Sequence, residues 1–417
     1  MECFLTCFFS VCLTGRRKYP STELHGLLHY LLDRMSTGES LDLLVLKELL
    51  CRMGGCETLL DVSHQQLEGL AGGRALRGEV MGAQVKDAVS KKAQRILRDT
   101  MLSSGTAIPL LLFIAQSRSN ILYDKNTSQL KLISYLYDTC QDVLMQFTDF
   151  LVGGNNKGVE SMVDIFPPMR HLLSDVGLNV SVAFQLVRPL IRAALHYGED
   201  PSAAPTELQN WHPFSAEMKS VVCENLPPDV WTALSPELYL TFWSLSLYDV
   251  FVPKAKYETE IRRLKDRYSE LDIKAPPSED RVASKQRRAE MTKILNLTNT
   301  LKEEQETQKK HVEIVRSMIK NNKDAYLAHV NAECSPKSTE NIMQYCVSYR
   351  VLMSPADAIF CSQFFLNLHA QETPGFSTIH FFDKTMKTLA PLTFCCTEYE
   401  AGFLGFYIND LLETCNR

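Results

Sequence analysis

The feature that most constrains this fold is a long, strongly charged stretch that follows Pro253 and continues to about Tyr326. In its first part, apolar residues recur at steps of 4, 3, 4 and 3: Tyr257, Ile261, Leu264, Tyr268 and Leu271. This spacing is typical of a coiled-coil seam with charged residues between the seam positions. Pro276 and Pro277 end that helix, and Ser278 with the acids after it favours the start of a second one.

The second helix carries a longer seam, in which seven of eleven positions are apolar: Met291, Ile294, Thr298, Leu301, Gln305, Gln308, Val312, Val315, Ile319, Asn322 and Tyr326. At roughly 1.5 Å per residue, this seam spans on the order of 50 Å, which is wider than a small domain. The helix must therefore either project beyond the body of the protein or bridge two parts of it. Two interpretations stay open, a solvated helix along the body of the protein and a protruding helical hairpin that holds a partner.

The segment before this arm predicts a buried helical unit. Ser235 provides a helix cap and Pro236 stands at the first helical position. The residues that follow leave almost no polar face: Phe242, Trp243, Leu245, Leu247, Tyr248, Val250 and Phe251. We predict that three of these, Phe242, Trp243 and Tyr248, are core anchors that hold the base of the arm to the body.

Charge is unevenly distributed along the chain, whose net charge is −5. Residues 254–324 hold 18 Lys and Arg against 13 Asp and Glu, a charge of +5, which leaves −10 for the remainder. Mixed signs favour salt-bridged helices over a dense phosphate-binding patch. An RNA-binding module that uses the basic arm stays open as an alternative.

Outside the arm, helical patterns dominate and predict an all-α fold, an extended helical stack of the α-solenoid type. Helices are expected at residues 23–32, 41–53, 86–102, 107–116, 129–152, 159–176, 180–197, 354–369, 380–389 and 397–415. Residues 346–353 and 379–382 look like short strands. The glycine-rich residues 69–82 lack the ending of a phosphate-binding loop and predict a mobile loop.

The composition divides the chain into successive units. They are an apolar N-terminal segment (1–16), a helical-repeat unit (17–197), a linker (198–213), a buried helical unit (214–253), the charged coiled-coil-like arm (254–330) and a C-terminal helical unit (331–417) that looks truncated. The apolar run of the first segment is too short for a membrane span, and its positive charges follow rather than precede it. We interpret it as a core-type helix rather than a membrane anchor or signal peptide.

The motifs that accompany catalysis or metal binding are missing from the sequence. It contains no HExxH, GxSxG, phosphate-loop or EF-hand pattern, and its 13 cysteines form no CxxC pair. Those cysteines predict free core thiols in a reducing compartment. His25 and His29 stand four apart but lack an evident third ligand. We therefore predict no catalytic, cofactor-binding or metal site, and a scaffold rather than an enzyme.

Several long motifs resemble one family. They are DLLVLKELLCRMGG (42–55), QLEGLAGG (66–73), LKLISYLYDTCQDVLMQF (130–147), FWSLSLYDVFVPKAKYETEIRRLK (242–265) and SPADAIFCSQFFLNLHAQETPGFST (354–378). In sequence and in order they resemble the middle region of the THO complex subunit 2 family, and the resemblance covers residues 17–417. Members of that family extend further on both sides, so the chain resembles a central fragment.

The resemblance implies a nuclear, non-enzymatic scaffold in messenger-RNA processing and export. Family members form the backbone of the THO complex, which joins a DEAD-box RNA helicase and an mRNA export adaptor in the transcription-export assembly. Their middle region includes a MIF4G-like helical-repeat domain and helps to dock the helicase. The expected partners are other THO subunits, the helicase, the adaptor indirectly, and RNA in the alternative above, with no membrane. A truncated product that does not assemble is the remaining alternative.

For the arm, the sequence predicts which side chains meet a partner. These partner-interface candidates are the apolar seam residues Tyr257, Ile261, Leu264, Tyr268, Val312, Val315 and Ile319.

Overall fold

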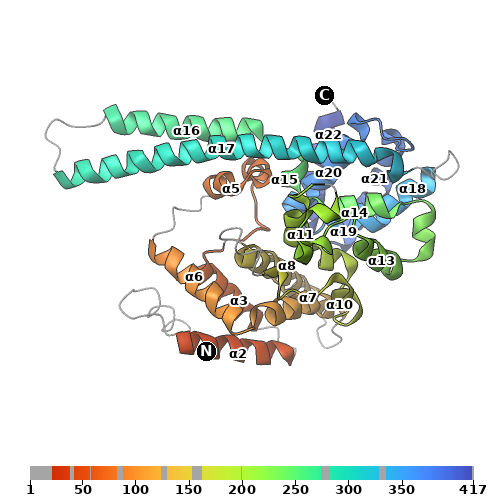
Figure 1. The fold of residues 1–417 in the computed structure, drawn as a ribbon, viewed down its shortest axis with the longest axis horizontal. Coiled ribbons are helices and arrows are strands. Elements are labelled where there is room, and N and C mark those ends of the chain that lie inside the picture. The colour runs from red at the N-terminus through yellow and green to blue at the C-terminus, as the bar shows by residue number, and fades with distance from the viewer. Residues whose placement is uncertain are drawn as a thin grey trace.

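The computed structural model describes residues 21–37, 42–56, 58–81, 88–123, 129–152, 162–198, 200–273, 281–327 and 335–415. This part of the chain is built from helices and contains no strand (Figure 1). The predicted all-α class is therefore confirmed, whereas the relation to MIF4G-like repeats stays a prediction. The predicted segment 1–16 and the break at Pro276 and Pro277 lie outside the described residues.

The first half of the chain contains mostly short and medium helices. In order, they are α2 (Ser21–Ser36), α3 (Asp42–Leu49), η1 (Leu50–Gly54), α4 (His64–Leu67), η2 (Glu68–Ala71), α5 (Arg74–Val80), α6 (Ala88–Ser103), α7 (Ala107–Tyr123), α8 (Leu130–Val152), α10 (Met169–Ser174), α11 (Val180–Leu195), η3 (Pro201–Ala203) and α12 (Thr206–Gln209).

The second half contains the longest helix of the structure. Its elements are α13 (Ala216–Asn225), η4 (Pro228–Thr232), α14 (Pro236–Ser244), α15 (Leu247–Val250), α16 (Lys254–Ile273), α17 (Arg281–Tyr326), α18 (Ser335–Ile342), η5 (Met343–Val347), α19 (Ser348–Arg350), α20 (Pro355–Ala370), α21 (Thr378–Leu392), η6 (Thr393–Cys395) and α22 (Glu398–Cys415).

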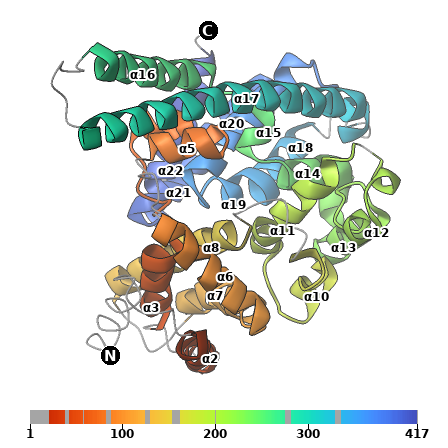
Figure 2. The ribbon, with the colours of Figure 1, turned by 60° about the vertical axis from the view of Figure 1, so that its left-hand side comes forward.

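The helices form a body that is crossed by one helical hairpin. Helices α16 and α17 run antiparallel, and the 46 residues of α17 form one continuous helix. Figures 1 and 2 both show the outer half of this hairpin projecting beyond the body, while the C-terminal half of α17 lies along it. That half contacts α14, α15 and α20. The outer half of α17 therefore belongs to a protruding hairpin and the inner half packs along the body, while the binding of a partner to the hairpin stays a prediction.

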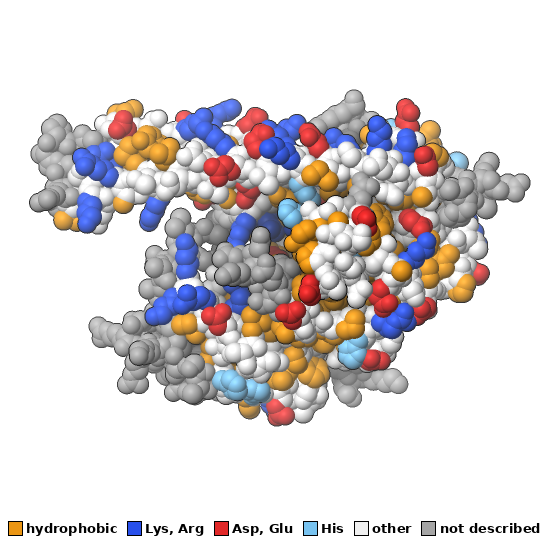
Figure 3. Space-filling model, viewed as in Figure 1, with side chains coloured by type: hydrophobic (Ala, Val, Ile, Leu, Met, Phe, Trp, Pro, Cys, Tyr) orange, Lys and Arg blue, Asp and Glu red, His pale blue; other side chains and the backbone are white. Residues whose placement is uncertain are grey.

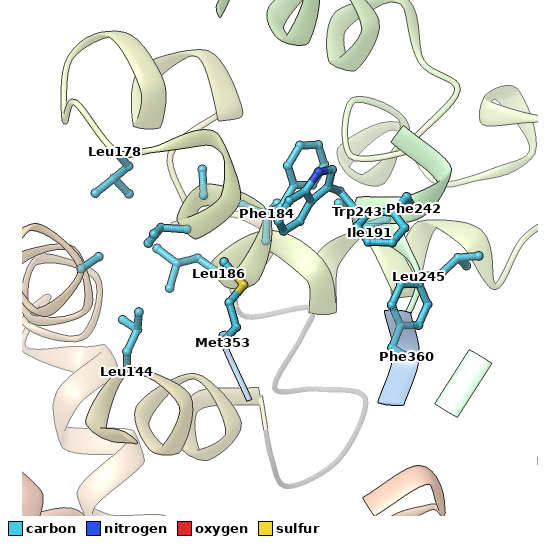
Figure 4. Packing of buried hydrophobic residues seen from close by; sticks show 14 of the residues in the cluster. Leu144, Leu178, Phe184, Leu186, Ile191, Phe242, Trp243, Leu245, Met353 and Phe360 are labelled. Atoms are coloured by element: carbon cyan, nitrogen blue, oxygen red, sulfur yellow. The ribbon is translucent and has the colours of Figure 1, made fainter. Parts of the chain in front are cut away.

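One large hydrophobic core joins the helices of the body. It includes residues of α8, α11, α14, α20 and α22 as well as the C-terminal half of α17. Figure 4 shows its centre, where Phe184 stacks on Trp243 with ring centroids 6.0 Å apart and Phe242 meets Phe360 at 5.4 Å. A fully buried aromatic side chain contributes about 2 to 3 kcal/mol through the water it excludes. This aromatic centre therefore connects residues far apart in the sequence.

Two predicted helix starts are confirmed in atomic detail. The Ser235 hydroxyl accepts a hydrogen bond from the Leu238 amide at 3.1 Å, and the Ser354 hydroxyl accepts one from the Asp357 amide at 3.0 Å. A proline occupies the first turn of both helices, where its missing N–H is not needed. Each cap satisfies an amide that the helix itself leaves without a partner.

The two predicted strands are wrong. Residues 346–353 belong to η5, α19 and the turn after it, and residues 379–382 lie in α21. The reason is burial. Cys346, Val347 and Val351 pack in the main core, and a short apolar run that is buried all round looks the same in a strand and in a helix.

Two further predictions need correction. A single helix at residues 159–176 is wrong for the described part, because Pro167 and Pro168 separate Met162 from α10. Residues 198–213 hold the short helices η3 and α12, and Trp211 is buried with its ring 6.1 Å from that of Phe166. Trp211 is thus a packing residue, while the predicted domain boundaries stay predictions.

No single helix among the described residues has both the length and the apolar composition of a membrane span. One pair, Lys91–Ser103 with Ala107–Tyr123, passes by length and composition only when the two helices are counted together across a bend of 89°.

Candidate functional site: the base of the helical hairpin

The predicted seam of α16 faces inward, toward α17 and α5. Tyr257 and Leu264 are buried, and Ile261 and Tyr268 are half-buried. They form a second, smaller core with the apolar residues of the two neighbouring helices: Leu76 of α5 with Ile294 and Leu301 of α17. The 3/4 spacing in the sequence therefore identified real contact positions. In the structure these contacts lie within the chain, so the partner-binding role of the seam stays a prediction.

The remaining predicted seam residues face the body. Val315 and Ile319 belong to the main core, and Val312 is 5% exposed beside Asp249 and Val250. One continuous seam along α17 thus packs on α16 in its outer half and on the body in its inner half. The seam residues hold the hairpin together and fix its angle to the body.

The glycine-rich segment docks under the hairpin and forms ordered helix where a mobile loop was predicted. Residues 68–71 form η2 and residues 74–80 form α5. A Cβ atom on Gly69 would lie 2.6 Å from Val80, and one on Gly72 would lie 2.4 Å from Leu76. On Gly73 it would lie 2.2 Å from the Glu304 carboxyl carbon. These glycines permit close packing, a cause that the sequence does not distinguish from loop flexibility.

A cluster of polar contacts, which we call the Glu304 cluster, joins α5, α16 and α17. The Glu304 carboxylate accepts hydrogen bonds from the amides of Ala75 at 2.8 Å and Leu76 at 3.1 Å, in the first turn of α5. The Tyr257 hydroxyl accepts from the Gly73 amide at 3.0 Å and lies 3.0 Å from the Glu304 carboxylate as a donor. A carboxylate at a helix N-terminus satisfies free amides and opposes the positive end of the helix dipole. Burial raises the pKa of Tyr257 and keeps this hydroxyl protonated.

Gln308 extends the Glu304 cluster to the body. It is fully buried, and its side-chain amide donates to the carbonyl oxygens of Ala71, Tyr248 and Phe251 at 2.7, 3.2 and 3.0 Å. Its own oxygen lies 3.1 Å from the Tyr257 hydroxyl. Because the Tyr257 hydroxyl has one proton, which it donates to Glu304, the carbonyl contacts of the Gln308 amide group are what fix the register of α17.

A second cluster, which we call the Asp249 cluster, holds α17 to α15. The buried Asp249 carboxylate accepts hydrogen bonds from the Ser246 amide at 2.6 Å and hydroxyl at 2.7 Å, and lies 2.8 Å from His311 Nε2. Burial alone would raise the pKa of Asp249, but the charge of Arg192, 3.5 Å away, and the His311 contact hold it well below its usual value. Tyr248, a predicted anchor, is half-buried with its ring 5.6 Å from His311. It therefore touches the arm, as expected.

The other two anchors surround a buried ion pair within the body. Arg350 is completely buried, donates to Asp357 at 2.9 Å and to the Leu245 carbonyl at 2.6 Å, and also bonds the Phe242 carbonyl. Its guanidinium carbon lies 3.6 Å from the centre of the Phe360 ring and 5.7 Å from that of Trp243. Burial, followed by the nearby Arg188 charge, lowers the pKa of Arg350 to about 10. Phe242 and Trp243 thus stabilise the body rather than contact the outer hairpin.

The sequence reasoning missed the acids at the centre of these clusters. Glu304, Asp249 and Asp357 look like ordinary helix-face carboxylates in the sequence, and each has at least one partner that lies 47 to 229 positions away. Gln308 gave no distinctive signal, because Thr298, Gln305 and Asn322 are polar seam positions as well.

The predicted absence of a catalytic, cofactor-binding or metal site stays a prediction. His25 and His29 lie close, with ring centroids 4.4 Å apart, but the described residues contain no group of three or more potential metal ligands. A polar cleft of about 360 Å³ lies beside the hairpin base, lined by side chains that include Gln66, Glu79 and Lys256.

Fold and site together define a class, an all-helical protein that holds a long helical hairpin at a fixed angle to its body. Residues 231–417 match the family described as "Transcription factor/nuclear export subunit protein 2". The chain is 32% identical to THO complex subunit 2 of Homo sapiens over 98% of its own length and 26% of that relative. Identity to the Arabidopsis thaliana subunit is 30% over 95% of this chain and 23% of that relative. To the Saccharomyces cerevisiae subunit it is 26% over 97% and 23%.

The chain belongs to the THO complex subunit 2 family. It spans about a quarter of the length of the curated relatives it matches.

Proposed function

We propose that this chain acts as a non-enzymatic scaffold region of a THO complex subunit, in the nucleus, in messenger-RNA processing and export. Its partners are other THO subunits, a DEAD-box RNA helicase and, indirectly, an export adaptor. The family relationship supports the place in the THO complex. The helicase and the adaptor are proposed as partners because the sequence motifs resemble those of the family.

One observation carries the scaffold proposal. Helix α17 is anchored to the body by half of its seam and by the Asp249 cluster, and its other half projects in a hairpin locked by the Glu304 cluster. A rigid projection keeps a surface on the hairpin and a surface on the body at a fixed separation. Binding of one partner then raises the local concentration of a second partner at the other surface.

Within this proposal, the seam residues act by holding the hairpin in place. The partners contact the outward residues of α16 and α17 and the exposed faces of the body. The predicted interface residues, including Tyr257 and Ile319, would then affect partner binding through the position of the hairpin.

The test uses the tagged full chain beside a variant with a shortened hairpin. Residues 266–291 are replaced by a four-residue Gly-Asn-Gly-Ser turn, which keeps Leu264 opposite Ile294 and leaves both clusters intact. Proteins recovered from nuclear extract are identified by mass spectrometry. We expect the full chain to recover THO subunits and the helicase, and the shortened chain to lose at least one of them. Recovery of no THO subunit by the full chain would overturn the proposal.

A further inference from the structure

Positive charge is concentrated in the outer part of the hairpin. Residues 281–300, the first half of α17, contain five Lys and Arg but one acid, Glu290. Residues 301–324, which lie nearer the body, contain six Lys and Arg and five acids. The body is acidic overall, since the chain outside residues 254–324 has a charge of −10. The hairpin therefore carries its excess positive charge away from an acidic body (Figures 1 and 3).

Some of these cations are neutralised within the chain and others are not. Arg263 pairs with Glu79 of α5 and with Glu260, and Arg267 pairs with Glu290. Five further cations are exposed and form no ion pair with another described side chain: Arg262, Lys265, Lys285, Arg288 and Lys293. The first four share one flank of the hairpin, whereas Lys293 lies on the other flank of α17. We call the first four the outer basic face.

The four cations lie on the same side of the hairpin. At about 100° per residue, Arg262 and Lys265 fall on the flank of the α16 seam opposite to Arg263 and Arg267. In an antiparallel pair, the matching flank of α17 carries Lys285 and Arg288. The Arg263–Glu79 pair places α5 on the other flank, so α5 does not cover the outer basic face.

The spacing of the cations suits a chain of phosphates. With the Arg267–Glu290 pair as the register, the four cations follow one another along the hairpin over about 15 Å, at 1.5 Å of rise per residue. Three acids lie near them: Glu258 and Asp266, each four positions from Arg262, and Asp272 at the outer end. Because duplex and single-stranded nucleic acids carry regularly repeated negative charges, such a row contacts successive phosphates.

An acidic partner helix fits the same surface less well. Such a helix needs an apolar stripe to pack on, and the exposed apolar residues here do not form one. Leu295, which is 51% exposed, and Val282, 61% exposed, stand 13 positions apart and face opposite flanks of α17. Ile273, 83% exposed, lies on α16, on the side away from its seam. For a nucleic acid, stacking of bases on the hairpin is not favoured either. Tyr268 is half-buried in the seam, so the described outer residues of the hairpin expose no aromatic ring on which a base could stack.

We propose that the outer basic face, formed by Arg262, Lys265, Lys285 and Arg288, binds the phosphate backbone of a nucleic acid without reading its sequence. The proposal is independent of the scaffold function. It also differs from the expectation that the charges of the arm would pair with one another in salt bridges, because the ion pairs described above do not include the four cations of this face.

The test measures binding of the full chain to a fluorescein-labelled 20-nucleotide oligo(U) RNA by fluorescence anisotropy. Each phosphate contact on a single strand contributes about 0.7 to the slope of log affinity against log salt, so four contacts predict a loss of about 50-fold between 50 and 200 mM salt. Replacing all four cations by Ala should abolish most of that salt dependence. The paired change Arg262→Lys with Arg288→Lys keeps the charge and should retain binding. Oligo(A) should bind as oligo(U) does.

A matched control removes four exposed cations elsewhere: Lys91, Lys92, Arg95 and Lys131. Equal weakening by this control and by the hairpin variant would show that only net charge matters and would overturn the proposal. Equal binding of polyglutamate of the same charge would assign the surface to acidic proteins and overturn it as well. The variant with all four hairpin cations replaced by Ala should still recover THO subunits from nuclear extract, because nucleic-acid binding and the scaffold function are separate proposals. A loss of RNA binding can therefore be told apart from a failure of the scaffold proposal.

Discussion

Removing one hydroxyl from the base of the hairpin should loosen the hairpin from the body. Tyr257→Phe keeps the ring in the small core and deletes only the oxygen that joins Gly73, Glu304 and Gln308. The Gly73 amide is then left buried without its acceptor, and the Glu304 carboxylate loses a donor. A buried polar group without a partner costs about 1 to 3 kcal/mol. Glu304 keeps its two amide donors and loses less than the Gly73 amide, so we expect a total of about 2 to 4 kcal/mol.

The assay is hydrogen exchange of the segment that contains Gly73 and Leu76, because the loss should appear first in the contact between α5 and the hairpin. A loss of 2 kcal/mol increases exchange by opening about 30-fold at 25 °C. Tyr268→Phe is the matched control, since Tyr268 lies in the same seam with no hydrogen bond described for its hydroxyl. If the two variants exchange at rates within a factor of two of each other, the reasoning about the Glu304 cluster is refuted.

Two other changes test the remaining buried charges. Burial, partly opposed by the Thr397 hydrogen bond, raises the pKa of Asp138 to about 6. The ionised carboxylate therefore disfavours the folded state, and the contribution of Asp138 to the free energy of unfolding falls as the pH rises from about 4 to 6. We therefore expect the free energy of unfolding of Asp138→Asn, relative to that of the unmodified chain, to rise by about 1 kcal/mol between pH 4 and pH 7, after allowance for solvent screening. Urea unfolding measures this difference, and a difference that does not change with pH contradicts the prediction. Arg350→Met removes hydrogen-bond donors from Asp357 and two carbonyl groups and should lower the free energy of unfolding by about 3 to 5 kcal/mol in the same assay. The control Lys387→Met breaks a surface ion pair and should lower it by under about 1 kcal/mol. Equal losses in the two variants contradict the argument.

The sequence predicted the seam of the arm well because its signal is local and periodic, but it left the hairpin as one of two interpretations. Every position of the predicted α17 seam, from Met291 to Tyr326, is buried or half-buried in the structure. The helix starts at Ser235 and Ser354 were also predictable, since a cap and its proline lie next to each other in the chain. Such features depend on neighbouring residues and need no knowledge of the fold.

The clusters that fix the hairpin were not predictable in the same way. Glu304 caps a helix that lies 228 residues earlier in the chain, and Arg350 bonds a carbonyl 105 residues away. No local pattern distinguishes these side chains from solvated ones. The glycines at 69, 72 and 73 were misinterpreted for a related reason, because the sequence does not show which side chain occupies the space beside them.

Gln308 connects the predictable and the unpredictable parts of this site. It stands between Leu301, which faces α5 and α16, and Val315, which faces the body, so it marks the point where the seam changes partner. A polar residue at a seam position lowers stability but specifies register, because its hydrogen bonds are satisfied in one alignment only. Here the partners are three carbonyl groups on two segments, Ala71 of η2 and Tyr248 and Phe251 of α15 and its C-terminal cap. Sliding α17 by one turn, about 5 Å, would leave all of them and the amide unpaired, so this residue fixes how far the hairpin projects.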